Sequence, residues 1–119
     1  MRLLIVTADH EFQQSVARGL QRFGHELRAA ANLPIAVALL RVEVVDVVLI
    51  ELSGQQPDRQ GLIRQLREVS PNCEVVMAAS NSAVMSRADA IRAGAFDSVR
   101  KDIRLAELEP VLERASQAS

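Results

Sequence analysis

Apolar positions along the chain alternate between two spacings, one typical of buried strands and one typical of amphipathic helices. Five short runs are continuously apolar or rich in β-branched residues, as expected for strands covered on both faces. These runs lie at residues 3–6, 27–30, 44–50, 75–78 and 96–99. The run at 44–50 is the strongest and the run at 27–30 the weakest. The sequence therefore predicts five strands.

Between the predicted strands, apolar residues recur at helical spacing and predict five helices. The inward faces are expected to consist of Phe12, Val16, Leu20 and Phe23; Ile35, Leu39 and Val42; Leu62, Ile63, Leu66 and Val69; Val84, Ala88 and Ile91; and Leu105, Leu108 and Leu112. Gly24 and Gly94 are placed as helix stops, and Ser80 or Ser82 as the N-cap of the fourth helix. A polar loop is expected over residues 53–60.

Strands that alternate with helices indicate a parallel sheet covered on both faces and joined by right-handed crossovers. The connecting segments are short, and the chain shows neither an internal repeat nor an interdomain linker. We therefore expect one doubly wound α/β domain over residues 1–119, with residues 115–119 as a tail or the start of a linker.

Composition narrows the function classes. The chain is 49% hydrophobic and 24% charged with a formal net charge of −1, which is typical of a folded domain. It has neither a basic excess nor any Trp or Tyr, so direct binding of nucleic acid is not expected. The longest apolar run, residues 33–40, is far below the roughly 18 residues of a membrane span. The single cysteine, Cys73, fits a reducing, cytoplasmic location.

Candidate chemistry is expected beyond the carboxyl ends of the strands, because open α/β sheets bind their ligands there. The residues that follow the predicted strands at this edge are 7–10, 51–52, 79–80 and 100–101.

Three segments together resemble the receiver domain of two-component response regulators, and the resemblance covers essentially the whole chain. Residues 3–6 resemble the first strand of that family, residues 45–50 the strand leading to its phospho-acceptor, and residues 93–101 its Gly-Ala-x-Asp-to-Lys segment. The resemblance implies a flavodoxin-like (βα)5 three-layer sandwich with a five-stranded parallel sheet in the order 2-1-3-4-5. It also implies a signalling module that acts through an attached or partner output domain.

The resemblance further implies a pocket in which two acidic residues help to hold Mg²⁺ and an aspartate accepts a phosphoryl group. In this chain the acidic pair falls on Thr7 and Ala8, with Asp9 one position later. The acceptor position is Glu51. Two negative charges are thus missing from the implied metal site.

The implied pocket also contains a Thr or Ser after the fourth strand and a lysine after the fifth. The hydroxyl position falls on Ala79, with Ser80 adjacent, whereas the lysine is kept as Lys101. Asp102 follows Lys101 where the family usually has proline, and the aromatic switch position is Ser98. Lys101 is the only lysine in a chain with thirteen arginines, although chance alone must place a single lysine somewhere.

Glu51 allows three interpretations: a phosphoryl acceptor, a permanent ion-pair partner or mimic of the phosphorylated state, and an inert polar residue. The extra methylene of glutamate would misplace the attacking oxygen, which can cost about 10²-fold in rate. We favour an ion pair between Lys101 and Glu51, since a compact ammonium is not interchangeable with a guanidinium in a small pocket.

Receivers commonly dimerise or bind partners through the fourth helix, fifth strand and fifth helix, and the resemblance implies such a face here. Its candidate residues are Arg87, Ile91, Arg92, Ser98, Arg100 and Arg104. Pro110 would kink the last helix and alter the shape of this face. The alternative is a merely solvated arginine surface.

The remaining chemically distinctive residues favour structural roles. His10 and His25 have no second histidine or cysteine at ligand spacing, so exposed histidines are expected. Asp46 is expected at a strand edge, and Cys73 as a core or edge residue without a histidine to activate it.

Three functions follow. The favoured one is a phosphorylation-independent receiver that binds protein partners, with no enzymatic activity and no cofactor. The first alternative is a phospho-accepting receiver that uses Mg²⁺, and the second is a small flavodoxin-like cofactor binder. The latter is disfavoured because residues 7–11 lack a glycine-rich phosphate cradle.

Overall fold

The computed structural model describes residues 1–52, 59–80 and 86–118. Its five strands are β1 (Arg2–Val6), β2 (Glu26–Ala30), β3 (Val47–Leu52), β4 (Glu74–Ala79) and β5 (Asp97–Arg100). They pair in parallel in the order β2-β1-β3-β4-β5. The expected doubly wound sheet and its strand order are confirmed.

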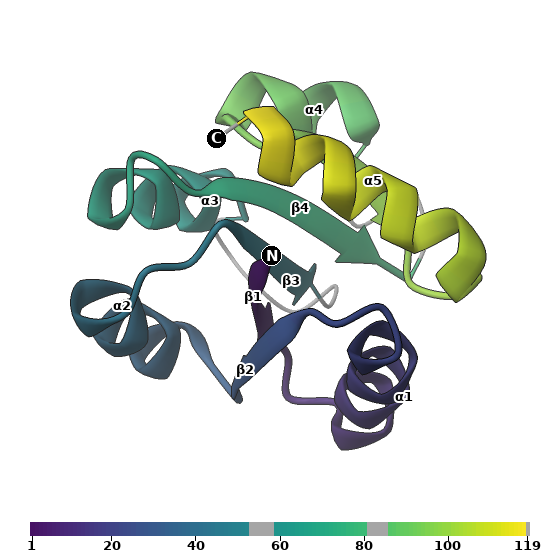
Figure 1. Ribbon diagram of the computed structural model, residues 1–119. Helices are drawn as coiled ribbons and strands as arrows, with labels where there is room; N and C mark the ends of the chain where they lie inside the picture. Colours follow the sequence, from purple (N-terminus) through teal and green to yellow (C-terminus); the bar gives the residue numbers. More distant parts are fainter. Residues whose placement is uncertain (53–58, 81–85, 119) are drawn as a thin grey trace.

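Helices follow each strand: α1 (His10–Gln21), α2 (Leu33–Val42), α3 (Arg59–Val69), α4 (Arg87–Ala93) and α5 (Leu105–Ala118). Residues of α2, α3 and α4 pack with one face of the sheet into one core cluster, and residues of α1 and α5 pack with the other face into a second. The two helical layers lie on opposite sides of the sheet in Figure 1. The predicted three-layer sandwich is therefore present.

Local sequence explains where several helices begin and end. The Asp9 carboxylate accepts a hydrogen bond from the Phe12 amide at 3.1 Å, and the Asn32 side chain accepts one from Ile35 at 3.0 Å. Such capping satisfies amide donors that have no partner inside the helix. Gly94 ends α4 with a φ of 113°, a conformation that favours glycine. The predicted stop at Gly94 is confirmed.

The cap of the fourth helix differs from the prediction. Ser86, not Ser80, caps α4 by accepting a hydrogen bond from the Asp89 amide at 3.1 Å, while Ser82 lies outside the described residues. The helix buries Ala90 and Ala93 and leaves Ile91 47% exposed, so the predicted apolar face was wrong. Val84 lies outside the described residues, as does most of the polar loop expected over residues 53–60.

The predicted face of α2 was also wrong. The helix buries Ala36, Val37 and Leu40, whereas Val42 is 80% exposed. Nearly every residue of this helix is apolar, so the sequence pattern allows more than one inward face. Contact with the sheet selects the face.

The ends of other elements are more exposed than expected. Phe23 lies past the end of α1 and is 56% exposed, and Val44 lies ahead of β3 and is 68% exposed. Asp46 stands at the strand edge as predicted, where its carboxylate accepts a hydrogen bond from the Arg2 amide at 2.7 Å. The last helix includes Pro110 without interruption.

Candidate functional site

The carboxyl ends of β1, β3, β4 and β5 bring together the side chains that the sequence singled out. Thr7 and Asp9 follow β1, Glu51 is the penultimate residue of β3, and Lys101 follows β5. The Lys101 amide donates to the Ala79 carbonyl at 2.7 Å, which extends the pairing of β4 and β5 by one residue. This backbone contact fixes Lys101 at the carboxyl edge of the sheet, and its side chain reaches across β4 to Asp9 and Glu51.

Lys101 contacts two carboxylates. Its Nζ lies 2.6 Å from Asp9 Oδ2 and 3.5 Å from Glu51 Oε1. The ammonium also lies 5.5 Å from the centre of the Phe12 ring, within reach of a cation–π interaction. The predicted pair between Lys101 and Glu51 is present, but the shorter contact is with Asp9, which sequence reasoning had not assigned to the lysine.

Asp9 has two roles because its two oxygens have different partners. Oδ1 caps α1 through the Phe12 amide, and Oδ2 accepts the hydrogen bond from Lys101. The capping position fixes the carboxylate at the start of the helix, with its second oxygen directed to the ammonium. An aspartate immediately ahead of a predicted helix was the signal in the sequence for this role.

Glu51 is held from the side of β1 as well. Thr7 Oγ1 donates to Glu51 Oε1 at 2.9 Å and accepts from the Asp9 amide at 3.0 Å. The Glu51 side chain is only 10% exposed, while Lys101 is 27% exposed. A single oxygen of Glu51 therefore contacts both a neutral hydroxyl and an ammonium, in a position largely shielded from solvent.

Protonation equilibria reflect these contacts. The hydrogen bond from Lys101, helped by the Phe12 amide, holds the pKa of Asp9 below its ordinary value. The hydrogen bond to Asp9 and the charge of Glu51 raise the pKa of Lys101, although partial burial opposes this change. Both shifts favour the charged forms of Asp9 and Lys101, so the two groups form an ion pair near neutral pH.

The other residues of the expected pocket contribute little polar chemistry. Ala8 is exposed, Ala79 is buried with 4% exposure, and Ser80 lies exposed beyond the end of β4. Within the described residues, the acidic side chains on Lys101 are Asp9 and Glu51, and these two would offer carboxylate oxygens to a metal ion there. Both already bind the ammonium, so a cation would have to displace Lys101 or share its ligands.

A cleft of about 260 Å³ opens beside Glu51, on the side of β1 and α2. Its lining is mostly apolar, with polar groups from Thr7, Asn32 and Glu51. The full lining consists of Val6, Thr7, Ala8, Ala31, Asn32, Leu33, Ile50, Glu51 and Leu62.

The arginines of the expected interaction face are paired with nearby acids. Their ion pairs are Arg87 with Asp97 at 2.7 Å, Arg92 with Asp89 at 2.9 Å, Arg100 with Asp102 at 3.1 Å and Arg104 with Glu107 at 3.1 Å. These arginine side chains are 70–84% exposed, Ile91 is exposed, and Ser98 is half-buried. The face therefore presents balanced charge around an exposed isoleucine, and no positive patch arises from these four residues.

The two histidines differ. His10 is exposed, as expected, but the side chain of His25 is only 6% exposed and contacts Glu109 on α5. The prediction of an exposed His25 was therefore wrong, because residues distant in sequence cover the ring. Cys73 is buried as predicted, and burial raises the pKa of its thiol to about 12.

Comparison with known proteins identifies the fold and the family. Residues 3–113 match the family model described as the response regulator receiver domain. The chain is similar to the alginate biosynthesis transcriptional regulatory protein AlgB of Pseudomonas aeruginosa, with 29% identity over 84% of this chain and 22% of that protein. It is also 28% identical to the regulatory protein AtoC of Escherichia coli, over 98% of this chain and 25% of that protein. The chain thus spans about a quarter of the length of these relatives.

Two solved structures of receiver or response-regulator proteins have a similar fold. The receiver domain of NtrX from Brucella abortus superimposes with a TM-score of 0.88 at 28% identity, over 98% of this chain and 99% of that one. A response regulator from Thermotoga maritima gives a TM-score of 0.86 at 23% identity, over 98% and 97% of the two chains.

Within the described residues, none of the helices is both long and apolar enough to cross a membrane.

Proposed function

The chain belongs to the response-regulator receiver family, and from that premise we propose that it is a receiver whose signalling does not use phosphorylation. In this proposal it is a protein-interaction module and not an enzyme. It regulates transcription through an output domain, attached or supplied by a partner. AlgB, one of the relatives that it matches, is a transcriptional regulatory protein several times its length, which supports this context.

The observation that carries the proposal is that the Lys101 ammonium already binds two carboxylates of the chain. By its resemblance to the family, Glu51 is expected at the acceptor position and Lys101 at the position of the lysine that binds the phosphoryl group. Here the ammonium lies 2.6 Å from Asp9 and 3.5 Å from Glu51, so the charge that would bind a phosphoryl group already has two carboxylate partners. Thr7 binds the same Glu51 oxygen, where the family has an acidic residue.

This arrangement imitates one aspect of a phosphorylated pocket. A negative group on β3 is bound by the lysine after β5, which links the two strands across β4. Because that charge is permanent, switching has to come from another source, such as a partner or an oligomeric state with different affinities for two conformations.

Phosphorylation at Glu51 is the alternative, and the two carboxylates near Lys101 are the observation in its favour. Mg²⁺ prefers several oxygen ligands and binds through carboxylates and substrate phosphate. With Thr7 and Ala8 at the positions of the acidic pair, Asp9 and Glu51 would have to hold the ion while Lys101 competes for both.

Intact mass after incubation with acetyl phosphate and Mg²⁺ distinguishes these two functions. We expect no added phosphoryl group on the folded protein, with or without chelator. The Glu51→Asp variant shortens the side chain to that of the family's acceptor and tests whether the residue alone is limiting. A phosphoryl adduct on the unmodified chain that disappears with chelator would refute phosphorylation independence.

A second test asks whether Glu51 affects association. We expect Glu51→Ala to change self-association in analytical ultracentrifugation while leaving the far-ultraviolet circular dichroism spectrum unchanged. Glu68→Ala, an exposed glutamate of α3, is the matched control. Identical sedimentation of the Glu51 variant and the unmodified chain over the same concentrations would exclude Glu51 as a determinant of self-association.

A further inference from the structure

Three side chains far from the Lys101 pocket converge on one point. His25 precedes β2, and Glu109 and Glu113 lie four residues apart on one face of α5. His25 Nε2 lies 3.2 Å from Glu109 Oε1 and 3.5 Å from Glu113 Oε1. The three ligand atoms, one from each residue, all lie within 4.8 Å of one another.

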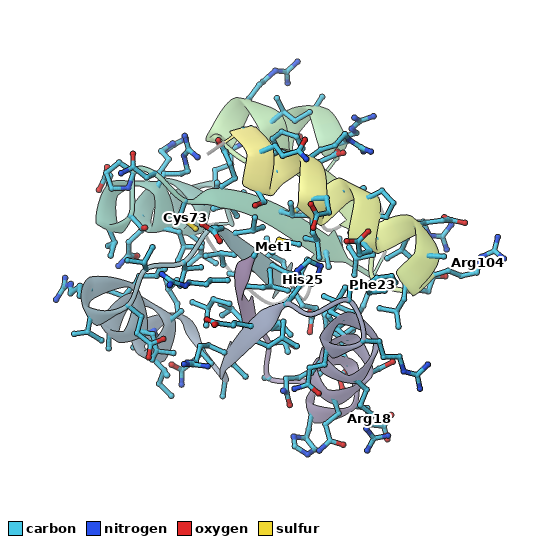
Figure 2. The ribbon with its side chains drawn as sticks, viewed as in Figure 1. Met1, Arg18, Phe23, His25, Cys73 and Arg104 are labelled. Atoms are coloured by element: carbon cyan, nitrogen blue, oxygen red, sulfur yellow. The ribbon has the colours of Figure 1, made fainter. Side chains whose placement is uncertain are left out.

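From this cluster we propose a binding site for a divalent first-row transition metal, of which Zn²⁺ is the probe. The proposal is independent of phosphorylation, because the cluster lies at the amino end of β2, whereas Glu51 and Lys101 lie at the carboxyl ends of their strands. Figure 2 shows His25 near the start of β2, beneath α5.

Two of the three spacings between the ligand atoms are close to those of a tetrahedral metal site. Zinc binds imidazole nitrogen and carboxylate oxygen at about 2.0–2.2 Å, so adjacent ligands of a tetrahedral site lie about 3.3–3.6 Å apart. The two distances from His25 Nε2, 3.2 and 3.5 Å, are close to that edge length. An ion can therefore enter with small movements of two glutamate side chains.

Burial favours a fixed site with one open position. The side chains of His25, Glu109 and Glu113 are 6%, 19% and 40% exposed, so the ring is enclosed and the solvent reaches the cluster from the side of Glu113. Three protein ligands leave a fourth position for water, as in zinc sites with three protein ligands.

The donor set determines the class of cation. Mg²⁺ and Ca²⁺ prefer oxygen ligands alone, whereas imidazole suits zinc, nickel, copper and iron. Two carboxylates balance the charge of a dication. One nitrogen and two oxygens therefore favour Zn²⁺ over the Mg²⁺ that a phosphorylation pocket would take.

The other ring nitrogen sets a condition for binding. His25 Nδ1 lies 3.0 Å from the amino group of Met1, and these residues are labelled together in Figure 2. When a metal binds Nε2, Nδ1 must carry the ring proton, so the amino group of Met1 must turn away from it. Without metal, Nε2–H can donate to Glu109, so the same residues form an ordinary hydrogen bond.

A bound ion would connect the segment ahead of β2 to the last helix, which are 84 residues apart in sequence at His25 and Glu109. Since the ion binds the folded arrangement, it stabilises the fold according to its concentration and affinity. At a hundredfold excess over Kd, we expect Tm to rise by about 10 °C.

The test is isothermal titration calorimetry of the metal-free chain with zinc chloride, in parallel with thermal unfolding. We expect one saturating equivalent of Zn²⁺, and no comparable binding of Mg²⁺ or Ca²⁺ at this cluster. Glu113→Gln, at the most exposed ligand, should keep the fold and weaken Zn²⁺ binding by about tenfold or more. His25→Gln should have the same effect.

Matched controls separate this site from other zinc-binding groups. His10→Gln removes the exposed histidine, Glu107→Gln removes a glutamate of the same helix, and Glu51→Gln alters the receiver pocket. All three should bind Zn²⁺ like the unmodified chain. The absence of saturable binding would overturn the proposal. It would also be overturned if Glu113→Gln and His25→Gln bound normally, or if Mg²⁺ bound the cluster as well as Zn²⁺.

Discussion

At the residue scale, Asp9 connects local and long-range structure. The same carboxylate caps α1 and accepts the short hydrogen bond from Lys101, a residue 92 positions away. Thr7 joins this arrangement through Glu51 and the Asp9 amide. A network formed by residues on three separate segments thus joins the loops at the carboxyl edge of the sheet.

The lowered pKa of Asp9 gives a signed pH dependence. A carboxyl whose pKa is lower in the folded than in the unfolded state stabilises the fold above its unfolded value of about 3.9. That stabilisation is lost as the pH falls through the folded value. We expect Asp9→Asn to lower the urea midpoint by a constant amount from about pH 5 upward and the difference to shrink below about pH 3.9.

The upper limit of this plateau comes from Lys101. Its raised pKa means that its contribution is complete below an unfolded value of about 10.4 and is lost as the pH rises through the folded value. Asp102→Asn, which removes an exposed partner of Arg100, is the control and should change the midpoint little. A difference for Asp9→Asn that grows below pH 3.9 would contradict the assignment.

Cys73 illustrates how burial determines reactivity. The thiol is 1% exposed and its pKa is raised to about 12, mainly by burial, so little thiolate forms at neutral pH. We expect an alkylating reagent at pH 7.5 to label the folded chain at least about a hundredfold more slowly than the chain in denaturing urea. Mass spectrometry over time measures both rates. Comparable labelling rates in the folded and the denatured chain would mean that the segment around Cys73, just ahead of β4, opens readily.

At the scale of elements, α2 shows what periodicity leaves open. Its residues are nearly all apolar, and the observed inward face contains Ala36, Val37 and Leu40 in place of the predicted Ile35, Leu39 and Val42. Leu39 still packs partly against the core. The α4 helix has the same ambiguity, since two alanines, not the larger Ile91, face the sheet.

This face can be tested with two substitutions on α2. Leu40 is 6% exposed, so Leu40→Ala should reduce the free energy of unfolding by about 2–5 kcal/mol through lost burial and a cavity. Val42 is 80% exposed, so Val42→Ala should change it by less than about 0.5 kcal/mol. Urea denaturation measures both. Equal losses of unfolding free energy would mean that Val42 contributes as much as Leu40, in contradiction to the observed inward face of α2.

At the scale of the whole molecule, the sheet separates two core clusters. Ile63 of α3 belongs to the cluster under α2, α3 and α4, and Ile5 of β1 belongs to the cluster under α1 and α5. Both side chains are fully buried. Because the strands are shared, loss of either cluster should unfold the domain as one unit.

Paired substitutions on the two faces test this arrangement. Ile63→Val and Ile5→Val should each cost about 0.5–1.5 kcal/mol and shift a single cooperative transition. The double variant should be additive within about 0.5 kcal/mol, because the two side chains do not share a cluster. Two separate unfolding transitions would show that the clusters unfold independently. A double variant far from additive would show that Ile63 and Ile5 interact across the sheet.

The sequence by itself determined the order and type of the elements and the edge of the sheet where the polar residues meet. Continuous β-branched runs and helical spacing are local patterns, and parallel strands necessarily bring Thr7, Glu51 and Lys101 to one edge. The sequence favoured an ion pair between Glu51 and Lys101 through the resemblance to the receiver family, with two other interpretations of Glu51 left open.

Only the tertiary structure decided the partners and the inward faces. The Asp9 contact of Lys101, the burial of His25 under α5 and the inward face of α2 depend on side chains that are distant in sequence or equally apolar. Local periodicity cannot rank such contacts, because their energies arise from packing and charge pairing across elements. The spacing of His25 from Glu109 and Glu113 exists only when α5 packs beside the start of β2.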